Sequence, residues 1–332
     1  MNPFYLVAGL VILAGAIVDI LWTTLWVDGG SGPISGHLTT VVWRGLRIVT
    51  RDHNRTLSLA GPIILTVTLA MWIGLIWLGW TLIFASHPHA LVSTRTGAVA
   101  DWSGRFYYVA YTMFTDGNGD YTPLGDVWEI ASAFTTASGM AFVTLGVSYV
   151  LTVLGAVSDK RSFASTVIGL GGRSEALVRT GWTGEDFQGL ELTVESLASE
   201  LSLLAEQHKS YPILHYYHSE DGEQASAVAV PILDEALMLF RYGIPDEQSL
   251  DPAIIANGRS SARSYLETLD ESFIEPEAAV PRSPDLGRLR EDDIPTVSDE
   301  EFAESLAELT DRRRRLLAVV EADAWEWPPL EE

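Results

Sequence analysis

The residues best suited to chemistry form one short run between two long apolar segments: Thr115, Asp116, Gly117, Asn118, Gly119 and Asp120. Oxygen atoms of carboxylates and backbone carbonyls are the ligands that hard cations prefer. Starting at Asp116, alternate side chains match the first three ligands of an EF-hand calcium loop. However, Tyr121 stands in place of its glycine and Val127 in place of its closing glutamate. The run therefore predicts cation chemistry, and an EF-hand is disfavoured.

The elements around this run are predicted membrane helices. Residues 4–26, 63–84 and 127–157 are apolar and long enough, at about 1.5 Å per residue, to cross a hydrocarbon core of about 30 Å. The first is too long for the core of a signal peptide, and no basic residue precedes it, so we expect a retained membrane helix. Residues 101–126 are too polar to span. They predict a short helix followed by a returning loop. Non-helical backbone occurs within the membrane only where it is buried in protein or lines a water-filled cavity.

Charged residues near the spans indicate their orientation. The segment 37–57 carries a stripe of arginines at helical spacing, which predicts an amphipathic helix at the membrane surface and marks the cytoplasmic side: Arg44, Arg47, Arg51 and Arg55. The N-terminus and the run at 115–120 are then expected outside, with the second half of the chain in the cytoplasm. Asp19, within the first span, faces a partner helix or lies near the helix end. Its closeness to Asp28, in the loop 28–33, favours the end.

Composition separates a membrane half from an acidic soluble half. Residues 1–160 hold 7 basic and 9 acidic residues, whereas 161–332 hold 14 basic and 35 acidic residues. Such a surface does not bind nucleic acid by charge attraction, and it suits a high-salt cytoplasm, as in a halophile-like protein. An ordinary acidic domain is the alternative. The absence of cysteine excludes disulfides and thiolate metal sites.

The second half, residues 158–332, predicts a cytosolic helical domain. Apolar spacing predicts a helix over 190–204, and others are expected over 232–242 (after Pro231), 251–269 and 299–322. Ser298 with Glu301 forms a capping-box pattern at the start of the last helix. Residues 275–297 are rich in proline and charge and predict a linker. The basic run 312–315 is expected to be a solvated face that pairs with nearby acids.

Other candidate sites in this half are weaker. His208, His215 and His218 lie near acidic residues in the sequence and allow metal binding or pH sensing, but a structural role is favoured. No arrangement of serine, histidine and aspartate stands out for hydrolysis. We therefore expect no enzymatic activity and no cofactor other than permeant ions.

The order of outer helix, short aromatic helix, Thr-x-Gly-x-Gly-Asp and inner helix, over residues 63–157, resembles the pore module of tetrameric potassium channels. In that family Thr-Val-Gly-Tyr-Gly-Asp forms the selectivity filter, in which rings of backbone carbonyls replace the hydration shell of the ion. Thr115, Gly117, Gly119 and Asp120 match it. The resemblance divides the chain into 1–58, a pore module at 59–157, and 158–332. It further implies three pore-helix tyrosines that support the filter and one inner-helix hinge: Tyr107, Tyr108, Tyr111 and Gly139.

Two positions depart from the family pattern. Asp116 replaces the usual valine and Asn118 the usual tyrosine. In the family these side chains pack behind the ion path, where a carboxylate needs hydrogen-bond donors or a raised pKa, and Asn118 cannot form an aromatic brace. Four copies of Asp116 and Asp120 around one axis favour cations and allow divalent ones.

With one pore loop per chain, we expect a homotetramer in the lipid bilayer of the cell membrane, conducting potassium. Val143, Val147 and Leu151, four residues apart, are expected either to form an apolar gate or to pack against neighbouring helices. The tail would either assemble the tetramer or couple a signal to the gate. The sequence does not identify the regulatory ligand that would carry this signal. The alternatives are a non-selective or divalent-permeable channel and a non-conducting membrane sensor or assembly protein. A potassium uptake transporter is disfavoured, because those carry four pore loops per chain.

Overall fold

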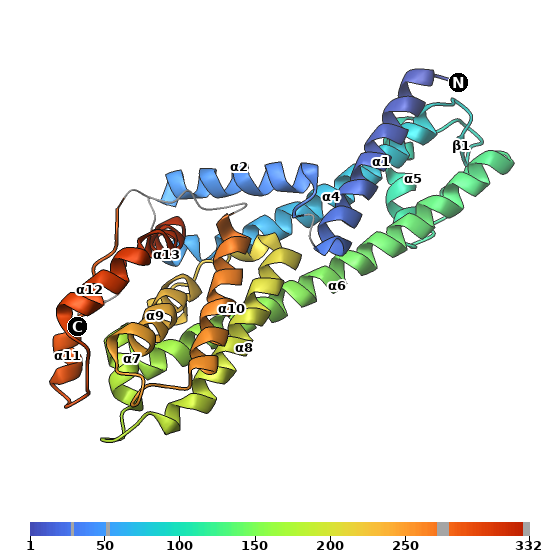
Figure 1. Ribbon diagram of the computed structural model, residues 1–332. Helices are drawn as coiled ribbons and strands as arrows, with labels where there is room; N and C mark the ends of the chain where they lie inside the picture. Colours follow the sequence, from blue (N-terminus) through green and yellow to red (C-terminus); the bar gives the residue numbers. More distant parts are fainter. Residues whose placement is uncertain (28–29, 51–53, 271–278, 328–332) are drawn as a thin grey trace. The chain divides into compact units, whose positions relative to one another are not determined.

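The computed structural model of the chain describes residues 1–27, 30–50, 54–270 and 279–327 (Figure 1). The chain forms two compact units. The first comprises Met1–Val42 and Pro62–Val153, and the second comprises Trp43–Gly61 and Leu154–Glu332. Predictions that involve Asp28, Arg51 and residues 275–278 fall outside the described residues.

Three helices of the described chain are long and apolar enough to cross a membrane. They are α1 (Pro3–Leu25), α4 (Ala60–Ala85) and α6 (Asp126–Leu170). The first two confirm the predicted spans, and Pro62 lies in the first turn of α4, where its missing N–H costs little. The predicted end of the third helix near residue 157 is wrong, because α6 continues unbroken for 45 residues. The end of the membrane span within this helix stays a prediction. No glycine or proline interrupts residues 156–168, and Phe163 of this extension is buried in the second unit.

Helices α1 and α4 pack antiparallel in the first unit. The backbone N–H of Asn2 donates to the carbonyl of Ser86, so α1 starts beside the end of α4. A Cβ atom added to Gly9 would lie only 2.7 Å from the carbonyl oxygen of Gly79. Small residues at this crossing therefore allow the two backbones to approach closely.

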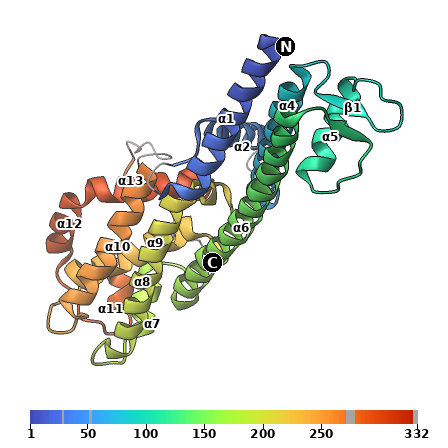
Figure 2. The same ribbon diagram turned by 90° about the vertical axis from the view of Figure 1, so that its right-hand side faces the viewer.

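Between α4 and α6 lie α5 (Trp102–Met113) and two short strands, β1 (Leu91–Ser93) and β2 (Tyr121–Pro123). The Asp101 side chain caps α5 by accepting a hydrogen bond from the N–H of Gly104 at 2.7 Å. The strands pair antiparallel, with Ser93 opposite Tyr121. Figures 1 and 2 show β1 beside α5 at one end of the first unit. The sequence predicted α5 but no strand, because three residues are too few to display an alternating pattern.

The predicted single helix over 37–57 is wrong in its bounds. The chain instead forms α2 (Pro33–Thr50) and α3 (Asn54–Leu57). Helix α2 starts early because Pro33 suits the first helical position, where its fixed φ is already helical. Val41 and Ile48 on α2 are 68% and 79% exposed. An interfacial helix requires such exposed apolar side chains.

The second unit is built around α9 (Ser226–Met238), every residue of which is buried. Helices α7 (Ser174–Gly181), α10 (Pro252–Asp270) and α13 (Thr310–Ala322) contact α9, and α8 (Gln188–Ser210) packs along α10. Short turns of helix complete this unit: η2 (Pro212–Tyr216), η3 (Gly222–Gln224), η4 (Leu239–Gly243) and α11 (Leu286–Arg290).

Several predictions for the tail need correction, although α8 and α10 confirm two predicted helices. Pro231 lies inside α9 rather than before it, so burial of the whole helix outweighs the missing hydrogen bond. The described part of the predicted linker contains α11. The helix expected over 299–322 is two helices, α12 (Asp299–Glu308) and α13, although Ser298 caps α12 as predicted. The basic run is only partly a solvated face, because Arg313 is 3% exposed. Its predicted pairing with acids is confirmed for Arg312 with Asp234, Arg313 with Glu235 and Arg314 with Asp311.

Candidate functional site

The run Thr115–Asp120 has an unusual backbone. Thr115, Gly117 and Gly119 have φ values of +62°, +59° and +78°. A positive φ at every second residue departs from a strand, in which successive carbonyls point to opposite sides. Glycine adopts this conformation readily, whereas a β-branched threonine adopts it at a cost of about 1–3 kcal/mol. Strained backbone of this kind concentrates at functional sites, so Thr115 marks the run as a candidate site.

The start of the run is held by the end of α5. The N–H of Thr115 donates to the carbonyl of Thr112 at 3.1 Å, and the N–H of Asp116 donates to the carbonyl of Tyr111 at 2.8 Å. The Asp116 side chain is exposed, as is every residue from Phe114 to Gly119. The structure thus fixes the backbone of the run from behind and leaves the run itself open on one surface of the chain.

The end of the run is held by a network of hydrogen bonds from polar side chains. Arg95 donates to one carboxylate oxygen of Asp120 at 3.0 Å, and Asn118 donates to the other oxygen at 3.1 Å. Asn118 also donates to the hydroxyl of Tyr107. The hydroxyl of Thr94 donates to the carbonyl of Gly119 at 2.8 Å. Asn118 therefore links Tyr107 to Asp120 through hydrogen bonds, which the sequence did not predict.

The other two tyrosines of α5 hold this helix to its neighbours. Tyr108 is 3% exposed and shares a hydrogen bond with Ser132 of α6. Tyr111 donates to the carbonyl of Tyr121 at 2.9 Å and accepts from the N–H of the same residue at 3.2 Å. Tyr107 thus contacts the side chains of Asn118 and Asp120, Tyr111 contacts the backbone next to the run, and Tyr108 packs toward α6. The support of a filter by these three tyrosines stays a prediction.

Gly139 lies where α6 crosses the end of α5. A Cβ atom there would fall 2.0 Å from the carbonyl oxygen of Met113. The surrounding helix is continuous, so the structure explains this glycine by close packing, and the predicted hinge stays a prediction. Of the predicted gate residues, Val147 and Leu151 are 56% and 67% exposed, and Val143 is half-buried.

Asp19 faces partner helices, which was one of the two predictions for it, and the favoured prediction of a position near the helix end is wrong. It is fully buried, and its carboxylate accepts hydrogen bonds from the N–H groups of Ile34 (2.7 Å) and Ser35 (3.1 Å) and from the indole of Trp72 (2.9 Å). The Ser35 hydroxyl also donates to it. Asp19 therefore joins α1 to the first turn of α2 and to α4. Only its position inside an apolar span signalled this role.

The three histidines of the second unit are buried or half-buried rather than arranged as a metal site. Burial lowers the pKa of His208 to about 3 and that of His215 to about 4, so both rings stay neutral at ordinary pH. His218 lies 3.3 Å from Asp323 and stacks on Trp325. In the part of the chain that the structure describes, no three His, Cys, Asp or Glu side chains are grouped to hold a metal ion.

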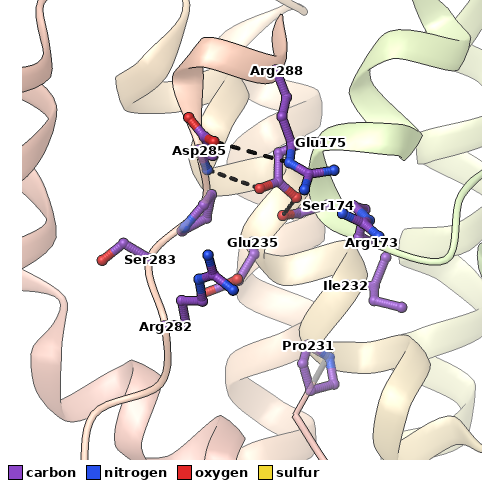
Figure 3. A pocket seen from close by; sticks show the side chains of 11 residues that line it. Arg173, Ser174, Glu175, Pro231, Ile232, Glu235, Arg282, Ser283, Asp285 and Arg288 are labelled. Carbon is purple, nitrogen blue, oxygen red and sulfur yellow. Dashed lines mark hydrogen bonds and ion pairs between the residues drawn. The ribbon is translucent and has the colours of Figure 1, made fainter. Parts of the chain in front are cut away.

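A small polar pocket of about 40 Å³ lies between α7, α9 and the segment that leads to α11 (Figure 3). Glu175 accepts hydrogen bonds from the N–H of Asp285 at 2.8 Å and from the hydroxyl of Ser174 at 3.2 Å. Burial raises the pKa of Glu235 to about 7, although Arg313 opposes this by donating to its carboxylate at 2.8 Å. Both carboxylates have partners within the chain, so the pocket joins elements of the second unit.

Comparison with known proteins gives one close relative. The chain is 41% identical over 332 residues to the "uncharacterized membrane protein YdjJ" of Bacillus subtilis (strain 168), and the match covers 100% of this chain and 97% of the relative. The chain belongs to the YdjJ family. The relative is named a membrane protein, and three helices of this chain are long and apolar enough to cross a membrane. This YdjJ-family chain is therefore an all-α membrane protein, apart from its short two-stranded sheet. No family model and no solved structure matches it.

Proposed function

We propose that this YdjJ-family chain forms a homotetrameric cation channel of the cell membrane, with potassium as its main permeant ion. Residues 115–119 of four copies would form a potassium-channel-like filter. The observation that carries this proposal is the positive φ at Thr115, Gly117 and Gly119. Such alternation turns successive carbonyls toward one side, as a ring of ion-binding carbonyls requires.

The surroundings of the run support an assembly of several copies. The run lies between two membrane helices and is exposed in the single chain. Irregular backbone at membrane depth is stable only where protein buries it or water reaches it. Four copies around a water-filled axis would meet both conditions, with the filter backbone facing water and the rest covered by neighbours.

The charges of the run favour monovalent cations. Arg95 pairs with Asp120, so the fixed negative charge of Asp120 is offset within the same chain. The exposed Asp116 is then the main source of excess negative charge along the run. A divalent-permeable or non-selective channel is the second candidate, and the exposed carboxylate of Asp116 is the observation that favours it.

The test is ion flux through the purified full chain reconstituted in liposomes, with potassium, sodium and calcium gradients. We expect potassium flux from the wild type and none from Gly117→Ala, because Gly117 needs a positive φ that an alanine side chain disfavours. The matched control is Gly74→Ala, at an exposed glycine in α4 where a Cβ meets nothing within 4 Å. It should conduct like the wild type.

Asp116→Val separates the two channel candidates. If Asp116 admits divalent cations, this substitution abolishes calcium flux and leaves potassium flux. A wild type that passes no cation across the tested range of pH and calcium, although it is folded and inserted, would refute the proposal. That outcome would favour a non-conducting membrane sensor or assembly protein.

A further inference from the structure

The first unit contains an apolar cavity of about 130 Å³ between α1, α4 and α6. Ile20 comes from α1, Leu69, Trp72 and Ile73 come from α4, and Val143 and Val147 come from α6. Met113, at the end of α5, also lines the cavity. All three helices are candidate membrane spans, so the cavity lies among segments that hydrocarbon surrounds.

Water has little to bind in this cavity. Trp72 carries the one side-chain hydrogen-bond donor of the lining, and its N–H already donates to Asp19 at 2.9 Å and contacts Ser35 at 3.1 Å. A buried water needs two to four polar partners, and apolar cavities of about 150 Å³ stay dry yet accept benzene. The cavity is therefore suited to a hydrocarbon occupant of about that size.

A glycine on α6 keeps the cavity open. A Cβ added to Gly146 would meet only the Cδ2 atom of Leu69, at 3.3 Å, which is the end of a flexible side chain. Packing therefore does not require glycine at this position, in contrast to Gly139. Any larger side chain at 146 would extend toward Leu69, which lines the cavity, and would occupy its volume.

From this geometry we propose that the cavity is a binding site for the end of a lipid acyl chain. The occupant is hydrocarbon because the lining is apolar and belongs to membrane spans. The rim includes Val147, which is 56% exposed, so a chain end can enter from the surface of the first unit. This binding does not depend on ion conduction, and its failure would leave the proposed function untouched.

The experiment uses the full chain in phosphatidylcholine vesicles that contain a lipid with a diazirine at the end of one acyl chain. After irradiation, mass spectrometry locates the labelled residues. We expect the label on residues that line the cavity, above all on Val143 and Ile73. Gly146→Leu should lower this labelling by about tenfold, equivalent to about 1.4 kcal/mol of binding, because the leucine side chain would occupy volume that the end of the acyl chain needs. Gly74→Leu, at the exposed glycine of α4, should leave it unchanged.

Equal labelling of Val143 in the wild type and in Gly146→Leu would overturn the proposal, as would the absence of label from the lining. If Gly146→Leu does not fold, Val143→Phe fills the cavity from the same helix and makes the same prediction for Ile73.

A neighbouring copy of the chain is the competing occupant. Because the chain has no cysteine, Val143→Cys can carry a single benzophenone. The proposal expects a lipid adduct from this probe, whereas a covalent dimer of two chains would refute it.

Discussion

Replacing Gly139 by alanine should destabilise the first unit, because the added Cβ has no room. It would lie 2.0 Å from the carbonyl oxygen of Met113 and 2.5 Å from its Cγ atom. The first of these atoms is backbone, so α5 and α6 must separate to relieve the clash. Overpacking of this kind costs about 1–3 kcal/mol. The end of α5 positions Thr115, so the same shift should also reduce the ion flux that the proposed channel function requires.

The matched control is Gly155→Ala on the same helix, where a Cβ meets nothing within 4 Å. There alanine should stabilise by about 0.5–1 kcal/mol through its higher helix propensity. A difference of about 2 kcal/mol between the two variants corresponds to about 4 °C in the midpoint of thermal unfolding, measured in detergent. If Gly139→Ala is as stable as Gly155→Ala, the packing argument is wrong. A stable variant with altered flux would instead support a hinge.

Three further predictions concern buried titratable side chains. Asp19→Asn should cost about 1.5–3 kcal/mol, because an amide cannot accept all the hydrogen bonds that the carboxylate receives, and an unchanged thermal midpoint would contradict this. Arg313→Leu should cost about 3–5 kcal/mol in urea unfolding by leaving Glu235 buried without its partner, and adding Glu235→Leu should recover part of the loss; a double variant no more stable than Arg313→Leu argues against the pair. The pKa of His208 is about 3 in the folded chain and 6.5 in the unfolded chain, so the unfolded chain binds a proton first as the pH falls. The free energy of unfolding is therefore unaffected by His208 above pH 6.5 and decreases as the pH falls from 6.5 toward 3. Wild type should therefore lose stability relative to His208→Leu across that window, whereas parallel curves would show that His208 does not titrate this way.

The positions of the membrane helices followed from composition alone. An apolar run of about twenty residues has few alternatives to a spanning helix, because lipid offers no partner to backbone polar groups. The end of α6 did not follow from composition. Residues 158–161 are polar, which suggested an end to the helix, but polar residues remain compatible with a helix that leaves the membrane. Lys160 is 4% exposed and donates to the carbonyls of Leu214 and Tyr217, partners that only the folded second unit provides.

Buried charges were misjudged for the same reason. Asp19 and Arg313 looked like groups that reach solvent, because a lone charge is costly to bury. The structure supplies partners from distant parts of the chain: Trp72 and the first turn of α2 for Asp19, and Glu235 for Arg313. A sequence does not display such pairings, because they depend on which helices become neighbours.

For the run Thr115–Asp120, the sequence and the tertiary structure determine different features. The sequence by itself determined that two glycines alternate with carboxyl and amide side chains between membrane helices, and this pattern predicted a cation site. Only the tertiary structure decided that Thr115 shares the positive φ of the glycines, that Asn118 bonds to Tyr107, and that Arg95 offsets Asp120. These features depend on α5 and on the paired strands, which bring residues 94 and 95 to the end of the run through contacts that no local pattern encodes.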